Sequence, residues 1–233
     1  IALHRKLGDR NRELHAGNWV KTSKESYEIR NRVLGIVGYG HIGSQLSILA
    51  ESLGMKVLYF DIEPKMSLGN ASPTRSLEEL LQKSDVISIH TPANNDTKNM
   101  FNEKNINKMK KGSFLINNAR GSIVDLKALA KAINIGHIKG AAIDVHPCEP
   151  ATNTEKFFTP LAGIKNVLLT PHIGGSTHEA QASIARDVSQ KISNFLLNGT
   201  TIGAVNFPGV QLPEARIGHE RILHFHQNVP GVL

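Results

Sequence analysis

The segment from Val33 to Asp61 constrains the fold of this chain more than any other part of the sequence. It reads as a short apolar strand, the glycine pattern Gly38-Tyr39-Gly40-His41-Ile42-Gly43, an apolar-periodic helix and a second strand closed by Asp61. In a dinucleotide-binding βαβ unit, the first glycine permits a tight turn, the second lets the backbone approach a pyrophosphate, and the third lets the helix lie close to the strand. The N–H groups and positive dipole of the helix N-terminus then face the phosphates. The segment therefore predicts a dinucleotide site.

Asp61, which lies 18 residues beyond Gly43, indicates which dinucleotide is bound. A carboxylate at the end of the second strand can accept hydrogen bonds from both ribose hydroxyls, and it would repel a 2′-phosphate. Three turn glycines in an ordinary βα unit are the alternative, but they leave Asp61 unexplained. We therefore predict NAD rather than NADP as the cofactor, with Lys65 nearby as the feature that weakens this preference.

Composition excludes several classes of protein. The chain has 233 residues, enough for one large or two small domains, and 40% of them are hydrophobic. Its formal charge is +7, but the basic residues are scattered and aromatic residues make up 5%, so we expect no nucleic-acid partner. The positive potential instead favours anionic ligands such as NAD and phosphorylated or carboxylated substrates. We predict no metal site.

The sequence also indicates a compartment. Cys148 is the single cysteine, which excludes an intramolecular disulfide and fits a reducing environment; it has no evident activating partner. No apolar run is long enough to span a membrane and no signal peptide is visible, so we expect a cytoplasmic protein with no membrane partner. The chain starts at Ile1 without Met and ends on an unfinished-looking segment, so we expect it to be a fragment.

Alternating strands and helices continue after the first βαβ unit, and this order predicts an α/β fold built on a parallel, doubly wound sheet with right-handed crossovers. Ser76 can cap a helix, and a Ser176-Thr-His-Glu179 capping box opens a long amphipathic helix that runs to Asn198-Gly199. Further strands are predicted at residues 86–90, 113–117, 140–145, 167–170 and, as a short candidate, 221–226, and further helices at residues 3–16, 102–110 and 125–135.

Polar side chains follow each predicted strand, where a doubly wound sheet binds its ligands. Polar residues at these positions are also expected for solubility alone, but their chemical mix argues for a site. These residues are the glycine loop, Asp61, His90-Thr91-Pro92, residues 117–120, residues 144–149 and Pro171-His172.

Three of these side chains suit hydride transfer at a hydroxy acid. Arg120 lies between Ala119 and Gly121, small neighbours that leave space for its guanidinium to clamp a carboxylate; the alternative is a surface arginine. His172 can exchange a proton with an alcohol near neutral pH, and Glu149 could stabilise the imidazolium. With 11 histidines in the chain, a structural role for any one of them is the alternative.

The glycine loop, Asn117-Asn118-Ala119-Arg120-Gly121, Asp144-Val145 with Glu149-Pro150, and residues 170–176 together resemble the D-isomer-specific 2-hydroxyacid dehydrogenases, over residues 1 to about 206. The resemblance implies that Arg120 binds the substrate carboxylate, that His172 is the acid/base and that Glu149 is its partner. Asp144 would accept a hydrogen bond from the nicotinamide carboxamide. We expect the NAD site to be lined by Gly38, Gly40, His41, Ile42, Gly43, Asp61, His90, Thr91, Pro92, Asn118, Ala119, Arg120, Asp144, His172, Ile173, Gly174 and Gly175.

The resemblance also implies a domain plan. Residues 1–175 would form the NAD-binding domain, with an arm near residues 17–28, around Trp19 and Lys21, at the interface of a homo-oligomer. Residues 176–206 would return to a substrate domain whose first half is missing here. Residues 207–219 would be a linker, and residues 220–233 would begin an ACT regulatory domain.

The tail narrows the activity within the family. Residues 201–208 and 223–233 resemble the approach to an ACT domain, which implies NAD-dependent oxidation of 3-phosphoglycerate to 3-phosphohydroxypyruvate, the first step of L-serine biosynthesis. His226 and Asn228 would help to bind L-serine as an effector, only in the complete protein; a disordered tail is the alternative. Other readings are a glyoxylate or hydroxypyruvate reductase, an NAD-sensing corepressor-like interaction protein, or a degraded gene product. Without the leading substrate segment, we expect NAD binding with slow turnover or none.

Overall fold

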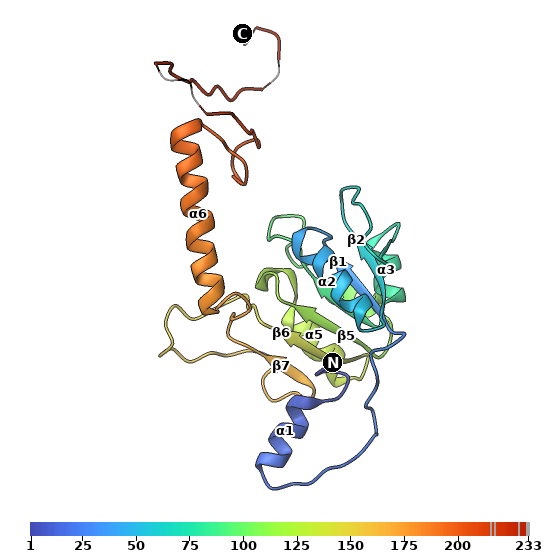
Figure 1. Ribbon diagram of the computed structural model, residues 1–233. Helices are drawn as coiled ribbons and strands as arrows, with labels where there is room; N and C mark the ends of the chain where they lie inside the picture. Colours follow the sequence, from blue (N-terminus) through green and yellow to red (C-terminus); the bar gives the residue numbers. More distant parts are fainter. Residues whose placement is uncertain (215, 217, 228, 232–233) are drawn as a thin grey trace. The chain divides into compact units, whose positions relative to one another are not determined.

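The structure is a computed structural model that describes residues 1–214, 216, 218–227 and 229–231 (Figure 1). The chain divides into two compact units, Ile1–Gly174 and Gly175–Leu233. Among the described residues, no helix is both long and apolar enough to cross a membrane. The predicted domain plan, with its substrate-domain, linker and ACT segments, stays a prediction.

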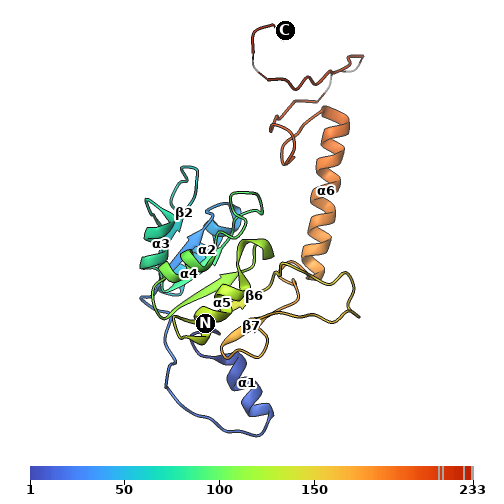
Figure 2. The ribbon, with the colours of Figure 1, turned by 180° about the vertical axis from the view of Figure 1, so that it is seen from behind.

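The first unit is built on one sheet of seven parallel strands, which confirms the predicted doubly wound α/β fold (Figures 1 and 2). The strand order is β3-β2-β1-β4-β5-β6-β7, so the sheet grows outward in both directions from β1 and β4. This reversal of strand order next to β1 is the point at which doubly wound sheets bind their ligands. The strands are β1 (Val33–Val37), β2 (Lys56–Phe60), β3 (Ser72–Pro73), β4 (Val86–Ile89), β5 (Ser113–Asn117), β6 (Ile138–Ile143) and β7 (Val167–Leu169).

Helices cover both faces of this sheet, because successive strand residues point to opposite sides and each side carries its own apolar cluster. Ile36 belongs to the cluster that includes Ala50 of α2 (His41–Ser52), whereas its neighbour Val37 belongs to the cluster that includes Leu80 and Leu129. The helices on this second side are α3 (Leu77–Lys83), α4 (Glu103–Lys108) and α5 (Leu126–Asn134).

The sequence predictions of these elements are confirmed to within a few residues at most ends. Ser76 accepts a hydrogen bond from the N–H of Glu79 at 3.1 Å, as a cap of α3 should. The predicted first helix is shorter than expected, because α1 (Leu7–His15) begins only after Lys6, whose left-handed backbone (φ 52°) interrupts it. The short strand β3 and the 3-10 turn η1 (Gly121–Ile123) were not predicted, since two or three residues carry no periodicity.

The second unit contains α6 (His178–Asn198), which ends at Gly199 in the left-handed conformation. Two predictions about this unit are wrong. Thr177, not Ser176, caps the helix, since its hydroxyl accepts from the N–H of Ala180 at 3.0 Å. Residues 221–226 form no strand, because a strand needs a hydrogen-bonded partner and the described part of this unit offers none. Asn228 lies outside the described residues.

Candidate active site at the carboxyl edge of the sheet

The glycine loop between β1 and α2 is fixed by contacts that leave no room for side chains at two positions. Gly38 has φ 92°, and a Cβ there would lie 2.6 Å from the carbonyl oxygen of His90. A Cβ on Gly43 would lie 2.2 Å from the carbonyl oxygen of Gly38, so α2 packs directly against the turn. These are the roles predicted for the first and third glycines of the pattern.

Gly40 differs from the other two glycines, because a Cβ at this position would meet no atom within 4 Å. Gly40 is also the N-cap of α2, and no side chain caps the helix at this end. The first turn of α2 contains no acidic residue, so nothing in the helix itself neutralises the positive end of its dipole. The space and the charge both suit a pyrophosphate.

Asp61 is bound to the glycine loop. Its Oδ2 accepts a hydrogen bond from the N–H of Tyr39 at 2.7 Å, and its Oδ1 accepts one from the N–H of Glu63 at 3.0 Å. Lys65 pairs with Glu63 at 2.6 Å, so its ammonium group is engaged within the same turn. Tyr39, which the sequence did not single out, stacks its ring on Tyr59 with centroids 3.8 Å apart and fixes the loop over β2.

The exit of β4 carries the three residues predicted to line the cofactor site. His90 Nε2 is 2.8 Å from the hydroxyl of Ser88, and burial lowers the pKa of the His90 imidazole. Thr91 Oγ1 is buried and has no hydrogen-bond partner among the described residues. A buried hydroxyl without a partner is uncommon, so this atom marks a place where a bound polar group could complete the hydrogen bonding.

The exit of β5 is a tight turn that presents Arg120. Asn117 closes it, since its side chain accepts from the N–H of Ala119 at 3.1 Å and donates to the carbonyl of Arg120 at 3.0 Å. Arg120 and Asn118 are exposed. One guanidinium nitrogen of Arg120 donates to the carbonyl of Ala119 at 2.7 Å, and among the described residues the four remaining N–H donors of the fork have no partner, which leaves them to bind a carboxylate.

Asp144 connects the exits of β6 and β7. Its carboxylate accepts from the hydroxyl of Thr170 and from the N–H groups of Ile173 (3.0 Å) and Gly174 (2.9 Å). Burial would raise the pKa of this carboxyl, but the three hydrogen bonds and the nearby His172 together lower it. Asp144 is therefore held as an anion under the loop that carries His172.

His172 and Glu149 are in contact, as predicted from the sequence. His172 Nδ1 lies 2.9 Å from Glu149 Oε2, and the other carboxylate oxygen of Glu149 accepts from the N–H of His146 at 2.9 Å. The hydrogen bond from the His146 backbone, followed by that from His172, lowers the pKa of the Glu149 carboxyl. His172 has a left-handed backbone (φ 54°), which is uncommon outside glycine, and its N–H donates to the carbonyl of Asp144 at 2.7 Å.

A cavity of about 430 Å³ lies beside this pair, with His146, Glu149 and His172 in its wall. The rest of the lining is mainly apolar or uncharged, including Phe157 and Leu169. No hydrogen bond joins Arg120 to either member of the pair in the part of the chain that is described here. Cys148 is exposed and is absent from the cavity wall.

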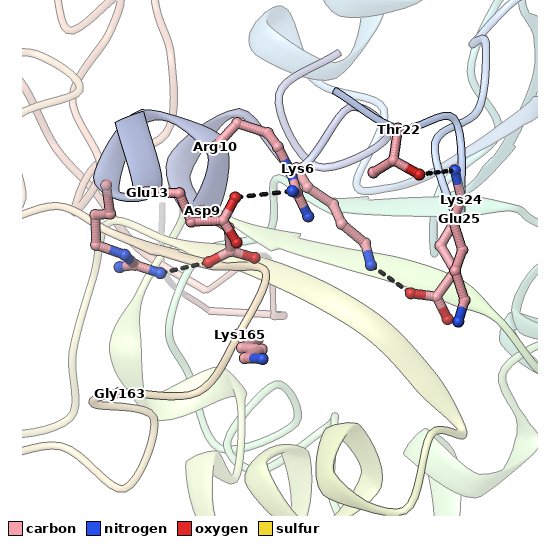
Figure 3. A pocket seen from close by; sticks show the side chains of 10 residues that line it. Lys6, Asp9, Arg10, Glu13, Thr22, Lys24, Glu25, Gly163 and Lys165 are labelled. Carbon is pink, nitrogen blue, oxygen red and sulfur yellow. Dashed lines mark hydrogen bonds and ion pairs between the residues drawn. The ribbon is translucent and has the colours of Figure 1, made fainter. Parts of the chain in front are cut away.

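A larger cavity of about 650 Å³ contains none of the predicted site residues (Figure 3). It lies between α1, the segment around Thr22 and Glu25, and the turn around Gly163 and Lys165. Its three carboxylates are each paired with a cation on the same wall: Glu25 with Lys6, Glu13 with Arg10 (2.7 Å) and Asp9 with Arg12. The wall also carries Lys24 and Lys165, so its cations outnumber its carboxylates by two.

The fold and the site together define the class of protein. It is a doubly wound dinucleotide-binding domain with a histidine–carboxylate pair at the carboxyl edge of its sheet. Residues 1–174 match the family described as D-isomer specific 2-hydroxyacid dehydrogenase, NAD binding domain. The chain therefore belongs to the D-isomer-specific 2-hydroxyacid dehydrogenase family and contains its NAD-binding domain.

Relatives and solved structures agree with this assignment. The whole chain is 53% identical to D-3-phosphoglycerate dehydrogenase of Haemophilus influenzae, and 47% identical to D-3-phosphoglycerate dehydrogenase 1 of Saccharomyces cerevisiae. It spans 57% and 52% of the lengths of those two proteins. The crystal structure of D-lactate dehydrogenase from Aquifex aeolicus, complexed with NAD and lactic acid, is similar with a TM-score of 0.73 and 32% identity, over 84% of this chain and 62% of that one.

Proposed function

We propose that this chain is part of an NAD-dependent dehydrogenase that oxidises 3-phosphoglycerate to 3-phosphohydroxypyruvate, the first step of L-serine biosynthesis. The observation that carries the proposal is the 2.9 Å contact between His172 and Glu149 at the carboxyl edge of the sheet. The relatives named D-3-phosphoglycerate dehydrogenase support the choice of substrate, because they match the chain from end to end. Because the chain spans little more than half of their length, the activity belongs to the longer protein.

The cofactor-binding role is assigned to the carboxyl edge of the central strands. The open space at Gly40 and the uncapped start of α2 would take the pyrophosphate, and Asp61 would take the adenosine ribose. The unpaired hydroxyl of Thr91 and the exposed Asn118 offer further polar contacts. Among the other predicted lining residues, His41 and Ile42 begin α2, Pro92 follows β4, Ala119 lies in the turn after β5, and Ile173 and Gly174 follow His172. When bound, NAD supplies the acceptor for the hydride that leaves the substrate carbon.

His172 is assigned the proton transfer. Its Nδ1 is engaged by Glu149, so Nε2 is the nitrogen that takes the proton from the substrate hydroxyl as the alcohol becomes a ketone, and that returns it in the reverse reaction. The Glu149 carboxylate orients the ring and stabilises the imidazolium that forms. The lowered pKa of Glu149 keeps this partner ionised.

Arg120 is assigned the role of binding the substrate carboxylate. Its exposed guanidinium bonds within its own loop through one nitrogen and leaves a planar pair of donors for a bidentate contact. Such an anchor holds the hydroxyl carbon in one orientation, which is the requirement for transfer of hydride to one face.

The proposal also includes two partners predicted from the sequence, a second copy of the chain and L-serine. We infer that the arm at residues 17–28 mediates a homo-oligomer, since Trp19 is 80% exposed and a tryptophan that open is typical of an interface. L-serine as an effector would involve His226, whose Nδ1 is 2.9 Å from the carbonyl of Gln227.

The test is a fluorescence titration of the chain with NADH, followed by addition of phosphohydroxypyruvate, with NADPH and glyoxylate as comparisons. We expect saturable NADH binding, and oxidation with the phosphorylated substrate when the chain is expressed within its longer protein. His172→Ala in that protein should abolish turnover and leave NADH affinity nearly unchanged. Absence of NADH binding, or an equal loss of binding and turnover in the variant, would contradict the assignment.

A further inference from the structure

Glu149 and His172 lie on two loops that contain no helix or strand around these residues. Glu149 comes six residues after the end of β6, and His172 comes three residues after the end of β7. The side chains are 37% and 49% exposed, and ion pairs between exposed groups contribute little by themselves. The contact at 2.9 Å therefore depends on other interactions that hold the two loops together.

Asp144 supplies part of this support, but it binds only the loop that carries His172. The side chain of His146 contacts that loop from the segment that carries Glu149. Its Nε2 lies 3.0 Å from the carbonyl oxygen of Thr170, two residues before His172. Its main-chain N–H donates to Glu149 Oε1 at 2.9 Å, so one residue contacts both sides of the pair.

These contacts determine which nitrogen of the His146 ring carries the hydrogen. A carbonyl oxygen can only accept a hydrogen bond, so Nε2 must carry the hydrogen. Nδ1 is buried and has no hydrogen-bond partner among the described residues, in a side chain that is 8% exposed. Leaving such an atom unpaired is unfavourable.

Packing alone does not explain an imidazole at this position. The ring meets the edge of Phe157 with centroids 4.6 Å apart, a contact that a phenylalanine ring would make equally well and without the unpaired nitrogen. What phenylalanine lacks is the donor to Thr170. The cost at Nδ1 is thus offset by the bond at Nε2, which connects the two loops.

We propose that His146 is a positioning residue: its imidazole holds the loop of His172 against the segment of Glu149, and thereby keeps the acid/base pair in contact. The kinetic part of this inference rests on the proposed function, whereas the structural part is independent of it.

Two substitutions separate the hydrogen bond from the packing. His146→Phe keeps an aromatic ring against Phe157 and removes the donor, whereas His146→Gln places an amide N–H near the position of Nε2. The first readout uses this chain alone: the carboxyl of Glu149 is titrated by carbon-detected NMR in both variants and in the parent. Urea unfolding midpoints of both variants verify that they are folded.

We expect the Glu149 titration midpoint to rise by at least about half a pH unit in His146→Phe, because the contacts that lower its pKa loosen, and to return toward the parent value in His146→Gln. A midpoint in folded His146→Phe equal to that of the parent would overturn the proposal. Equal shifts in both variants would also overturn it, since they would show that any loss of the imidazole perturbs the loop.

The second readout is turnover in the longer protein. We expect His146→Phe to lower kcat about 3-fold to 10-fold, with the KM for NADH unchanged, and His146→Gln to recover most of the loss. A matching fall in NADH affinity would show a general structural role instead. If the parent itself has no dehydrogenase activity, the proposed function fails while the NMR titration still decides the role of His146.

Discussion

The N–H of Tyr39 donates to Asp61 Oδ2 at 2.7 Å, so the acid at the end of β2 closes the glycine loop. The same carboxylate is the group assigned to the ribose of NAD. Asp61 thus has a structural role that a sequence motif does not reveal, and the two roles can be separated by substitution.

Asp61→Asn keeps an oxygen acceptor for Tyr39 and removes the charge, whereas Asp61→Ala removes both. We expect Asp61→Asn to fold, because its amide N–H would face only the exposed N–H of Glu63, and we expect it to bind NADH about 10-fold more weakly and to discriminate less against NADPH. Asp61→Ala should in addition lose about 1–3 kcal/mol of unfolding free energy, because the N–H of Tyr39 is left without its partner. Fluorescence titrations with both nucleotides and urea unfolding would measure these effects. An unchanged NADH affinity in Asp61→Asn would contradict the ribose assignment.

Gly43 and Gly40 provide a matched pair, since only one of them lacks space for a side chain. A Cβ on Gly43 would lie 2.2 Å from the carbonyl oxygen of Gly38, so Gly43→Ala must displace α2 from the turn. We expect it to destabilise the fold by about 2–4 kcal/mol, as overpacking against backbone does. Gly40→Ala meets no atom within 4 Å, so its stability should be within about 0.5 kcal/mol of the parent while NADH binding weakens. Similar stabilities in the two variants would contradict this division of roles.

The sequence predicts the central part of this fold well because the strands and helices there are long enough to show their periodicity. It places Arg120, Glu149 and His172 at the carboxyl edge of the sheet, because each lies in the segment that follows a predicted strand. It does not predict which neighbours hold these residues. The bonds from Asp144 to Ile173 and from His146 to Thr170 join segments more than 20 residues apart, and no local pattern encodes them.

Competition between two adjacent N-cap candidates explains the wrong prediction at the start of α6. Ser176 and Thr177 are adjacent and both suit an N-cap, so the capping-box pattern favours Ser176, whereas the backbone places the Thr177 hydroxyl against the N–H of Ala180. The missing strand at residues 221–226 has a different cause. Strand formation depends on a partner that is distant in the sequence, and the apolar pattern of one segment cannot supply it.

His4 gives the fold a pH dependence in the weakly acidic range. Burial first, and then the positive charge of Arg32, lower the pKa of His4 from 6.5 to about 4, although Asp85 opposes the shift. Between these values the unfolded chain binds more protons than the folded chain, so stability is complete above pH 6.5 and falls as the pH drops toward 4. We expect a loss of up to about 3 kcal/mol across this window. Urea unfolding at several pH values would measure it, and His4→Phe, which keeps a ring on Phe114, should remove most of the dependence.

Protonation of Asp144 should cause a second loss of stability, at more acidic pH, that is confined to the loop carrying His172. The pKa of its carboxyl is lowered, so its contribution to stability is present above the ordinary value near 4 and is lost as the pH falls through the folded value. At that point protonation removes charge from the hydrogen bonds to Thr170, Ile173 and Gly174, and the left-handed backbone of His172 loses its support. We expect the protection of the amides at residues 173–174 against hydrogen exchange to fall below about pH 4, before the sheet unfolds.

Asp144→Asn tests the same hydrogen bonds at neutral pH, because it removes the charge of the carboxylate without acid. The amide group must place an N–H against one of the two main-chain donors, so one hydrogen bond is replaced by a clash between donors. We expect about 2–4 kcal/mol of destabilisation, with the same loss of amide protection at residues 173–174 that acid produces in the parent. Gly43→Ala is the control, because the clash of its Cβ with the carbonyl oxygen of Gly38 should cost a similar amount of stability at the start of α2, away from the His172 loop. If Gly43→Ala loosens residues 173–174 as strongly as Asp144→Asn does, then the loop responds to general destabilisation and Asp144 does not hold it.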